Sequence, residues 1–286
     1  MRLSTNRPKA APNNRPAILA LPWHSPARTL LEVGEPPLVL LVGDPGTGKT
    51  TFARQAALDA TGMLPLVLSG SPEAEQSHLF GRWTLSGNET RFTDGPLPAA
   101  LKSGRWLLIE EFSQIPIECR ASLLPLRDQG EITNPMTGEV IPVPPTFRMI
   151  ATSNSETLTC RKNAGIAQVL YDGFLIFKVP ELGDAHIRRF LTHHFPSAGS
   201  ERTRRVIELW TEYRGITAKG SSGKTFLSYR AAAHLAALLG RGMDEVQAVQ
   251  IALVNKFLPA DADLFSVARL KNSISVPADE DPSESF

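Results

Sequence analysis

The sequence predicts an α/β fold in which a doubly wound, parallel five-stranded sheet is followed by a small all-helical domain. Before Pro180, short runs of leucine and β-branched residues alternate with helical segments, and after it only helical segments follow. Strands buried on both faces consist of such continuous apolar runs, and strands that alternate with helices favour a parallel sheet. The chain has 286 residues, enough for one large domain and a smaller one.

The individual elements follow from the apolar runs and from the positions of proline and glycine. The expected strands are 38–43, 64–70, 105–110, 147–154 and 174–180. The expected helices of the first domain are 50–61, one that starts at Ser71-Pro72, 97–104 with Gly104 as its end, and 115–130 with a kink at Pro125. The expected helices of the second domain are 184–195, 200–213, 227–240 and 244–257.

These patterns divide the chain into four parts. Residues 1–24 are rich in proline, arginine and lysine, as in a flexible basic arm, and 258–286 form an acidic tail. Between them, 25–181 form the α/β core and 182–257 a helical lid.

The overall composition favours a protein of the cytoplasm. The net charge is +1, so nothing in it demands a nucleic-acid or membrane partner. Two cysteines are too few for a disulfide framework, and no apolar run has the length that spans a bilayer. We therefore expect no membrane association.

The first strand ends in the motif GDPGTGKT, which is the P-loop pattern G-x-x-x-x-G-K-[ST] with a buried strand before it and a helix after it. Its glycines let backbone N–H groups turn toward phosphates, and the lysine neutralises the β- and γ-phosphates. The alternative is a glycine-rich turn with a surface lysine. The expected nucleotide-binding residues are Gly43, Asp44, Pro45, Gly46, Thr47, Gly48, Lys49, Thr50 and Thr51, with the Thr50 hydroxyl as a ligand of Mg²⁺.

The third strand runs directly into two carboxylates, Glu110 and Glu111. A P-loop needs a second acidic site on a neighbouring strand to hold Mg²⁺ and to activate water. We expect Glu110 to contact the hydration shell of Mg²⁺ and Glu111 to act as the general base. Without the P-loop, an exposed strand end with two solvated carboxylates would be the better interpretation.

The fourth strand ends in Asn154, which we expect at the same edge of the sheet. There it can hydrogen-bond the γ-phosphate or the attacking water. An asparagine that ends a strand is otherwise usually a turn residue.

The P-loop, the acidic strand and the Asn154 strand, followed by a helical domain, resemble an AAA+ ATPase over roughly residues 27–257. Segments 78–112 and 130–154 resemble the two hairpin inserts of the MoxR and dynein-related branch. Segment 227–242 resembles the lid helix that carries the second sensor, which makes Arg230 its arginine.

The resemblance implies ATP as the nucleotide, Mg²⁺ as the metal and a homo-oligomeric, typically hexameric ring with ATP between neighbouring subunits. It also implies remodelling of a protein partner, and MoxR-type members often work with a von Willebrand A-domain protein. The sequence itself does not name that partner.

Two positions depart from the family pattern. Glu110 stands where the family usually has aspartate, and Gly173 where related sequences have an arginine that reaches into the neighbouring subunit's site. Such an arginine contributes orders of magnitude in rate, so we expect retained ATP binding with slower hydrolysis unless another residue replaces it. Arg161 is our preferred replacement, and the other candidates are Lys162, Arg188 and Arg189.

Two further functions remain open. One is a nucleotide-gated assembly scaffold or switch with little turnover. The other is a DNA-directed motor or loader of a mobile element, in which Arg82 and Arg91 would grip a strand. The near-neutral charge counts against the second.

Overall fold

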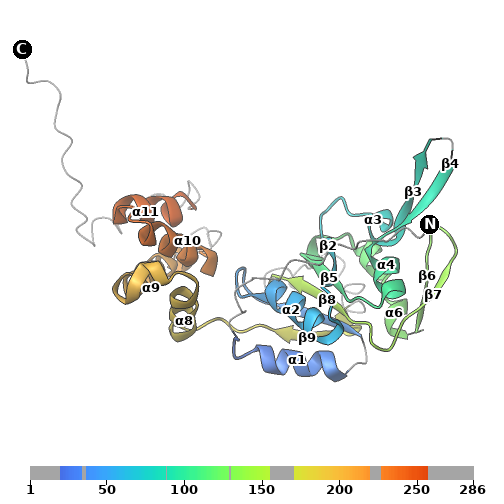
Figure 1. Ribbon diagram of the computed structural model, residues 1–286, viewed down its shortest axis with the longest axis horizontal. Helices are drawn as coiled ribbons and strands as arrows, with labels where there is room; N and C mark the ends of the chain where they lie inside the picture. The colour runs from blue at the N-terminus through green and yellow to red at the C-terminus, as the bar shows by residue number, and fades with distance from the viewer. Residues whose placement is uncertain are drawn as a thin grey trace, which may run out of the picture.

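A computed structural model describes residues 20–33, 37–87, 89–128, 130–154, 171–219 and 227–256. These residues form an α/β core that carries two β-hairpins, with a helical lid joined to it after the last strand (Figure 1). The acidic tail expected over 258–286, most of the expected arm, and Arg161 and Lys162 lie outside the described residues. Within the described part of the chain, no helix is both long and apolar enough to cross a membrane.

The core contains the predicted five-stranded sheet. Its strand order is β2-β5-β8-β1-β9, and every neighbouring pair in this order is parallel. The fold class predicted from the apolar runs is therefore confirmed. The strands are β1 (Leu38–Val42), β2 (Leu66–Ser69), β5 (Leu107–Glu110), β8 (Met149–Ser153) and β9 (Leu175–Lys178).

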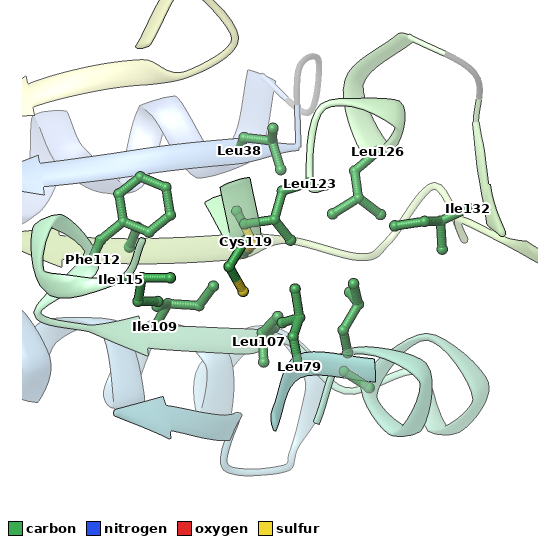
Figure 2. Packing of buried hydrophobic residues seen from close by; sticks show 14 of the residues in the cluster. Leu38, Leu79, Leu107, Ile109, Phe112, Ile115, Cys119, Leu123, Leu126 and Ile132 are labelled. Carbon is green, nitrogen blue, oxygen red and sulfur yellow. The ribbon is translucent and has the colours of Figure 1, made fainter. Parts of the chain in front are cut away.

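Strand β1 is buried along its whole length, and its alternating side chains enter two separate cores. Val39 and Leu41 pack with α1 (His24–Val33) and α2 (Lys49–Thr61). Leu38 and Leu40 face the opposite layer, part of which Figure 2 shows around Leu107, Ile109 and Phe112. Because helices cover both faces, the strand has no polar side, which explains its continuous apolar sequence.

The prediction that a helix starts at Ser71-Pro72 is wrong. The Ala74 N–H donates to the Ser71 carbonyl at 3.1 Å, so proline lies in a turn rather than in a first helical turn. Helix α3 (Gln76–Phe80) starts later, behind a capping box formed by Glu75 and His78.

The segment 115–130, predicted as one kinked helix, is broken into separate pieces. They are α5 (Ile117–Ala121) and α6 (Pro125–Asp128), and the 3₁₀ helix η1 (Phe112–Gln114) precedes them. Pro125 has no N–H to donate and its ring clashes with the preceding turn, which here ends a helix rather than bending it. By contrast, α4 (Pro96–Ser103) ends at Gly104 as predicted, with Gly104 at φ 69°.

Both expected inserts are antiparallel hairpins. They consist of β3 (Gly81–Ser86) with β4 (Glu89–Asp94), and of β6 (Glu131–Thr133) with β7 (Val140–Pro142). The Trp83 Nε1–H donates to the Met136 carbonyl at 3.4 Å, and Lys102 bonds both Asp94 at 3.0 Å and Glu139 at 2.8 Å. These contacts link the two hairpins to each other.

The lid has a hydrophobic core of its own, built from apolar residues of its four α-helices. A short connection, Val179 to Gly183, joins it to strand β9. The lid helices are α8 (Asp184–His194), α9 (Gly199–Lys219), α10 (Tyr229–Gly240) and α11 (Glu245–Ala252), with the 3₁₀ turns η3 (Pro196–Ala198) and η4 (Val254–Lys256).

The start of helix α1 is packed onto the core. Trp23, which we had assigned to the flexible arm, is only 2% exposed, and its ring centroid lies 4.9 Å from that of Phe52. The neighbouring His24 ring also contacts Phe52, at 5.0 Å. Burial, with a smaller contribution from the charge of Arg28, lowers the pKa of His24 from 6.5 to about 4.

This lowered pKa predicts a pH-dependent loss of stability. Between pH 6.5 and about 4 the unfolded chain binds a proton at His24 that the folded chain does not, so stability falls as the pH falls through this window. His24→Gln removes this contribution, and its melting temperature should drop less than that of the wild type between pH 7 and pH 5. The exposed His234→Gln is the control. Equal drops in the wild type and His24→Gln would contradict the assignment.

Candidate active site

A cavity of about 370 Å³ lies where β1, β5 and β8 end, between the core and the lid. This volume is within the range of small-molecule sites, and the carboxyl edge is where open α/β sheets bind ligands. The core residues that line it are Leu21, His24, Pro45, Gly46, Thr47, Gly48, Lys49, Thr50, Thr51, Glu111, Thr152 and Asn154. The lining residues from the connection and the lid are Leu182, Ile187, Phe190, His194, Tyr229, Arg230 and Ala233.

The turn after β1 has the backbone that its glycines predict. Gly46 and Gly48 adopt φ of 84° and 89°, a region in which side chains are strained. Gly43 is needed for a different reason, because a Cβ there would lie 2.9 Å from the Val179 side chain. Gly43 and Asp44 do not line the cavity. Their carbonyls instead accept hydrogen bonds from Lys49.

Lys49 lies inside this turn, with its side chain folded back against the backbone. Its Nζ donates to the carbonyls of Gly43 at 2.6 Å and Asp44 at 2.9 Å, and the residue is 8% exposed. Burial lowers the pKa of Lys49, whereas the nearby carboxylates of Glu111 and Asp44 raise it. The ammonium is thus held at the cavity wall by carbonyl groups, ready to exchange them for a phosphate.

Glu111 has an unusual backbone. Among the residues that the structure describes, it is the one non-glycine residue with positive φ, at φ 50° and ψ 45°. Holding glutamate in this region costs about 1–2 kcal/mol, and such strain concentrates at functional sites. The Asn154 Nδ2–H donates to Glu111 Oε2 at 3.4 Å. The structure therefore brings the predicted general base and the predicted asparagine into direct contact.

Glu110 points elsewhere. Its Oε1 lies 3.3 Å from the guanidinium of Arg54, one turn into α2, and Glu110 does not line the cavity. The predicted contact of Glu110 with the hydration shell of Mg²⁺ stays a prediction. Sequence reasoning did not find Arg54, because only the folded chain brings α2 beside the end of β5.

The oxygen donors at the site fit Mg²⁺. Thr50 and Glu111 line the same cavity, and Mg²⁺ usually takes one or two protein oxygens together with water and substrate phosphates. The described residues contain no group of three or more histidine, cysteine, aspartate or glutamate side chains that could hold a metal.

The Arg54–Glu110 pair predicts how the site responds to Mg²⁺. If Glu110 is the metal-side residue, Arg54 competes with the metal for its carboxylate. Because the pair is partly exposed, we expect Arg54→Gln to lower the Mg²⁺ concentration needed for half-maximal ATP affinity by a modest factor, up to about fivefold. Titration of a fluorescent ATP analogue against Mg²⁺ measures this.

The matched control is Arg28→Gln, which also removes an arginine on a core helix from an exposed ion pair, with Asp59 at 2.8 Å. An unchanged Mg²⁺ midpoint in Arg54→Gln, or an equal shift in Arg28→Gln, would argue against competition at Glu110.

Arg230 is the residue through which the lid contributes a positive charge to the site. A Cβ placed on Gly46 would lie 3.4 Å from the Arg230 backbone nitrogen, so the first turn of α10 touches the P-loop. The charge of Arg230 also contributes to the lowered pKa of Lys49. Two cations from different domains therefore lie close enough to share one polyanionic ligand.

None of the candidates for a replacement arginine that the structure describes lines this cavity. Arg161, our preferred candidate, lies outside the described residues. Gly173 lies just before β9, and Arg188 and Arg189 are exposed on α8 and do not line the cavity. Sequence reasoning missed other side chains that line the cavity, including His24, Phe190 and His194. No motif marks Phe190 and His194 on their predicted helix, and His24 begins α1, a helix that the sequence analysis does not predict.

A P-loop after a buried strand, a carboxylate and an asparagine at the next strand ends, and a lid arginine define an AAA-type nucleotide-binding protein. Residues 38–174 match the model of the AAA domain of the dynein-related subfamily. The chain therefore carries a dynein-related AAA domain, as the resemblance predicted.

Several known proteins are similar to this chain. Protein NorQ of Paracoccus denitrificans is 28% identical over 227 residues, which cover 79% of this chain and 82% of NorQ. Midasin of Dictyostelium discoideum is 30% identical over 122 residues, which cover 42% of this chain and 2% of midasin. A crystal structure of a Cytophaga hutchinsonii protein aligns at 16% identity and a TM-score of 0.44, covering 86% of this chain and 80% of that one. The chain is thus a distant relative of NorQ over most of its length.

Proposed function

We propose that this protein hydrolyses ATP with Mg²⁺ in a homo-oligomeric ring and uses the hydrolysis to remodel a protein partner. One observation carries the hydrolysis: Lys49, Glu111, Asn154 and Arg230 line a single cavity at the carboxyl edge of the sheet. Each of these residue types has a distinct task in phosphoryl transfer to water.

The chemistry assigned to these residues is hydrolysis of the terminal phosphate. The P-loop N–H groups and Lys49 hold the β- and γ-phosphates, and Glu111 accepts the proton of the attacking water. Asn154, bonded to Glu111, orients the carboxylate and the water. Bound Mg²⁺, held through Thr50, would neutralise charge on the phosphates.

The ring and the remodelling activity rest on the relationship to the MoxR and NorQ branch, supported by the two linked hairpins. Trp83 and Leu85 on the first hairpin are 56% and 76% exposed, which is unusual for such large apolar side chains. Exposed apolar side chains on an insert favour contact with another protein, either a neighbouring subunit or the remodelled partner, such as one with a von Willebrand A-domain.

Assembly in the presence of ATP tests this proposal. Light scattering after gel filtration should show a ring-sized species with Mg²⁺ and a slowly hydrolysed ATP analogue, and smaller species without nucleotide. Trp83→Ser with Leu85→Ser should retain nucleotide binding but lose either assembly or partner capture. A monomer under all nucleotide conditions would contradict the ring.

A switch with little turnover is the second candidate. It is favoured by Gly173 at the position of the expected arginine and by the exposure of Arg188 and Arg189 away from the cavity. Phosphate release distinguishes the two functions.

A further inference from the structure

The connection between the core and the lid is held by one tyrosine of the lid. The Leu182 backbone N–H donates to the Tyr229 hydroxyl at 2.9 Å, and the same hydroxyl donates to the Leu182 carbonyl at 3.4 Å. Tyr229 is 6% exposed, and burial raises the pKa of its phenol, so the hydroxyl stays protonated and can serve both bonds. The first turn of α10 is thereby attached to the connection between β9 and α8.

An arginine of helix α9 strengthens this attachment. Arg214 donates to Glu181 Oε1 at 2.6 Å, next to Leu182 in the connection. Its guanidinium lies 5.2 Å from the Trp210 ring centroid and 5.8 Å from that of Tyr229, both within the range of cation–π attraction. Glu181, Arg214 and Tyr229 therefore join the connection, α9 and α10 in one cluster, which we call the hinge latch.

The hinge latch also reaches the P-loop. A Cβ on Gly46 would lie 3.5 Å from the Tyr229 Cβ and 3.4 Å from the backbone nitrogen of Arg230. The residue whose hydroxyl holds the connection is thus the immediate neighbour of the arginine that joins the nucleotide cavity. A change in the position of Tyr229 should therefore also shift the backbone of Arg230, from which the arginine side chain extends.

We propose that the hinge latch positions Arg230 over the P-loop and so sets the preference of the site for ATP over ADP. Tyr229 lines the cavity, and we assign it a positioning role because its hydroxyl bonds the connection at Leu182. The inference rests on the proposed function, because it takes ATP as the ligand of the cavity.

The charges at the site explain why the γ-phosphate is the group whose binding depends on the position of Arg230. Arg230 and Lys49 are close enough for each to feel the charge of the other, so bringing them together is unfavourable without an anion between them. The γ-phosphate adds negative charge at the P-loop that ADP lacks. Arg230 close to the P-loop therefore stabilises bound ATP more than bound ADP. When Arg230 is displaced, this difference in affinity is lost.

Calorimetric titration with Mg-ATP and Mg-ADP tests the proposal on the full chain. Tyr229→Phe keeps the ring and removes both bonds to Leu182, and we expect it to weaken ATP binding about tenfold and ADP binding less than twofold. Glu181→Gln removes the exposed end of the latch, and we expect a smaller loss of the same preference, about threefold. Its control is Glu201→Gln, which removes an equally short ion pair, Glu201–Arg204 at 2.6 Å, within α9.

A double-mutant cycle separates positioning from a general loss of lid stability. Arg230→Ala should abolish most of the preference for ATP, and adding Tyr229→Phe should then change ATP affinity little, because both changes act through one arginine. Additive losses, or equal losses for ATP and ADP, would overturn the hinge latch. If Tyr229→Phe does not fold, an unchanged ATP-to-ADP ratio in Glu181→Gln overturns it. A wild-type protein that binds neither nucleotide would instead refute the proposed function.

Discussion

Glu111→Gln is expected to reduce phosphate release by a factor of about 100 to 10,000 while leaving ATP bound. Glutamine has nearly the same shape and can still accept a hydrogen bond from Asn154, but it cannot take the proton of the attacking water. Removing a general base typically has an effect of this size. The P-loop and Lys49 are unchanged, so affinity for ATP should stay within a few fold. Phosphate release at saturating ATP, together with ATP titration, measures both quantities.

The control for this variant is Glu118→Gln on α5, an exposed glutamate outside the cavity that should leave both quantities unchanged. Glu111→Gln that turns over at the wild-type rate would show that another group activates the water.

Lys49→Ala is expected to weaken ATP binding by about 100-fold, because it removes the buried charge that faces the phosphates. Charge-assisted hydrogen bonds contribute about 1.5–3 kcal/mol, which corresponds to roughly a 10- to 150-fold change in affinity. The variant also removes one hydrogen-bond partner from each of the carbonyls of Gly43 and Asp44, so we expect some loss of stability as well. Calorimetry with ATP measures the affinity, and a thermal melt reports the stability.

Lys102→Ala is the matched control, because it removes a lysine that also has two close partners, Asp94 and Glu139, but lies on α4 away from the cavity. If Lys49→Ala bound ATP as tightly as Lys102→Ala does, the glycine-rich turn would not be a phosphate site.

Much of the fold was predictable because buried parallel strands have an unmistakable sequence pattern. Strand β1 is buried from Leu38 to Val42, so every residue had to be apolar. Pro180 marks the change to helices because it lies in the short connection that precedes the lid. Two of the helix predictions failed at prolines. Pro72 and Pro125 are compatible with a first helical turn, a kink or a break, and local sequence does not select among them.

The site was predictable to the extent that it follows strand ends. The P-loop, Glu111 and Asn154 each come directly after a strand, so the order of strands in the sheet is enough to bring them together. The Arg54–Glu110 pair was not predictable, because it joins residues 56 positions apart on a helix and a strand. Tyr229 was missed for a similar reason: its hydroxyl bonds the backbone of Leu182, which lies 47 positions earlier in the chain.

The central claim is that the cavity hydrolyses ATP rather than only binding it. Steady-state phosphate release by the wild-type protein, measured with Mg-ATP over a wide range of protein concentration, tests this most directly. We expect Mg²⁺-dependent release whose rate per molecule rises with protein concentration, as subunits complete one another's sites, and which Glu111→Gln abolishes. ATP that binds at every concentration without measurable phosphate release would contradict an ATPase and establish the nucleotide-gated switch instead.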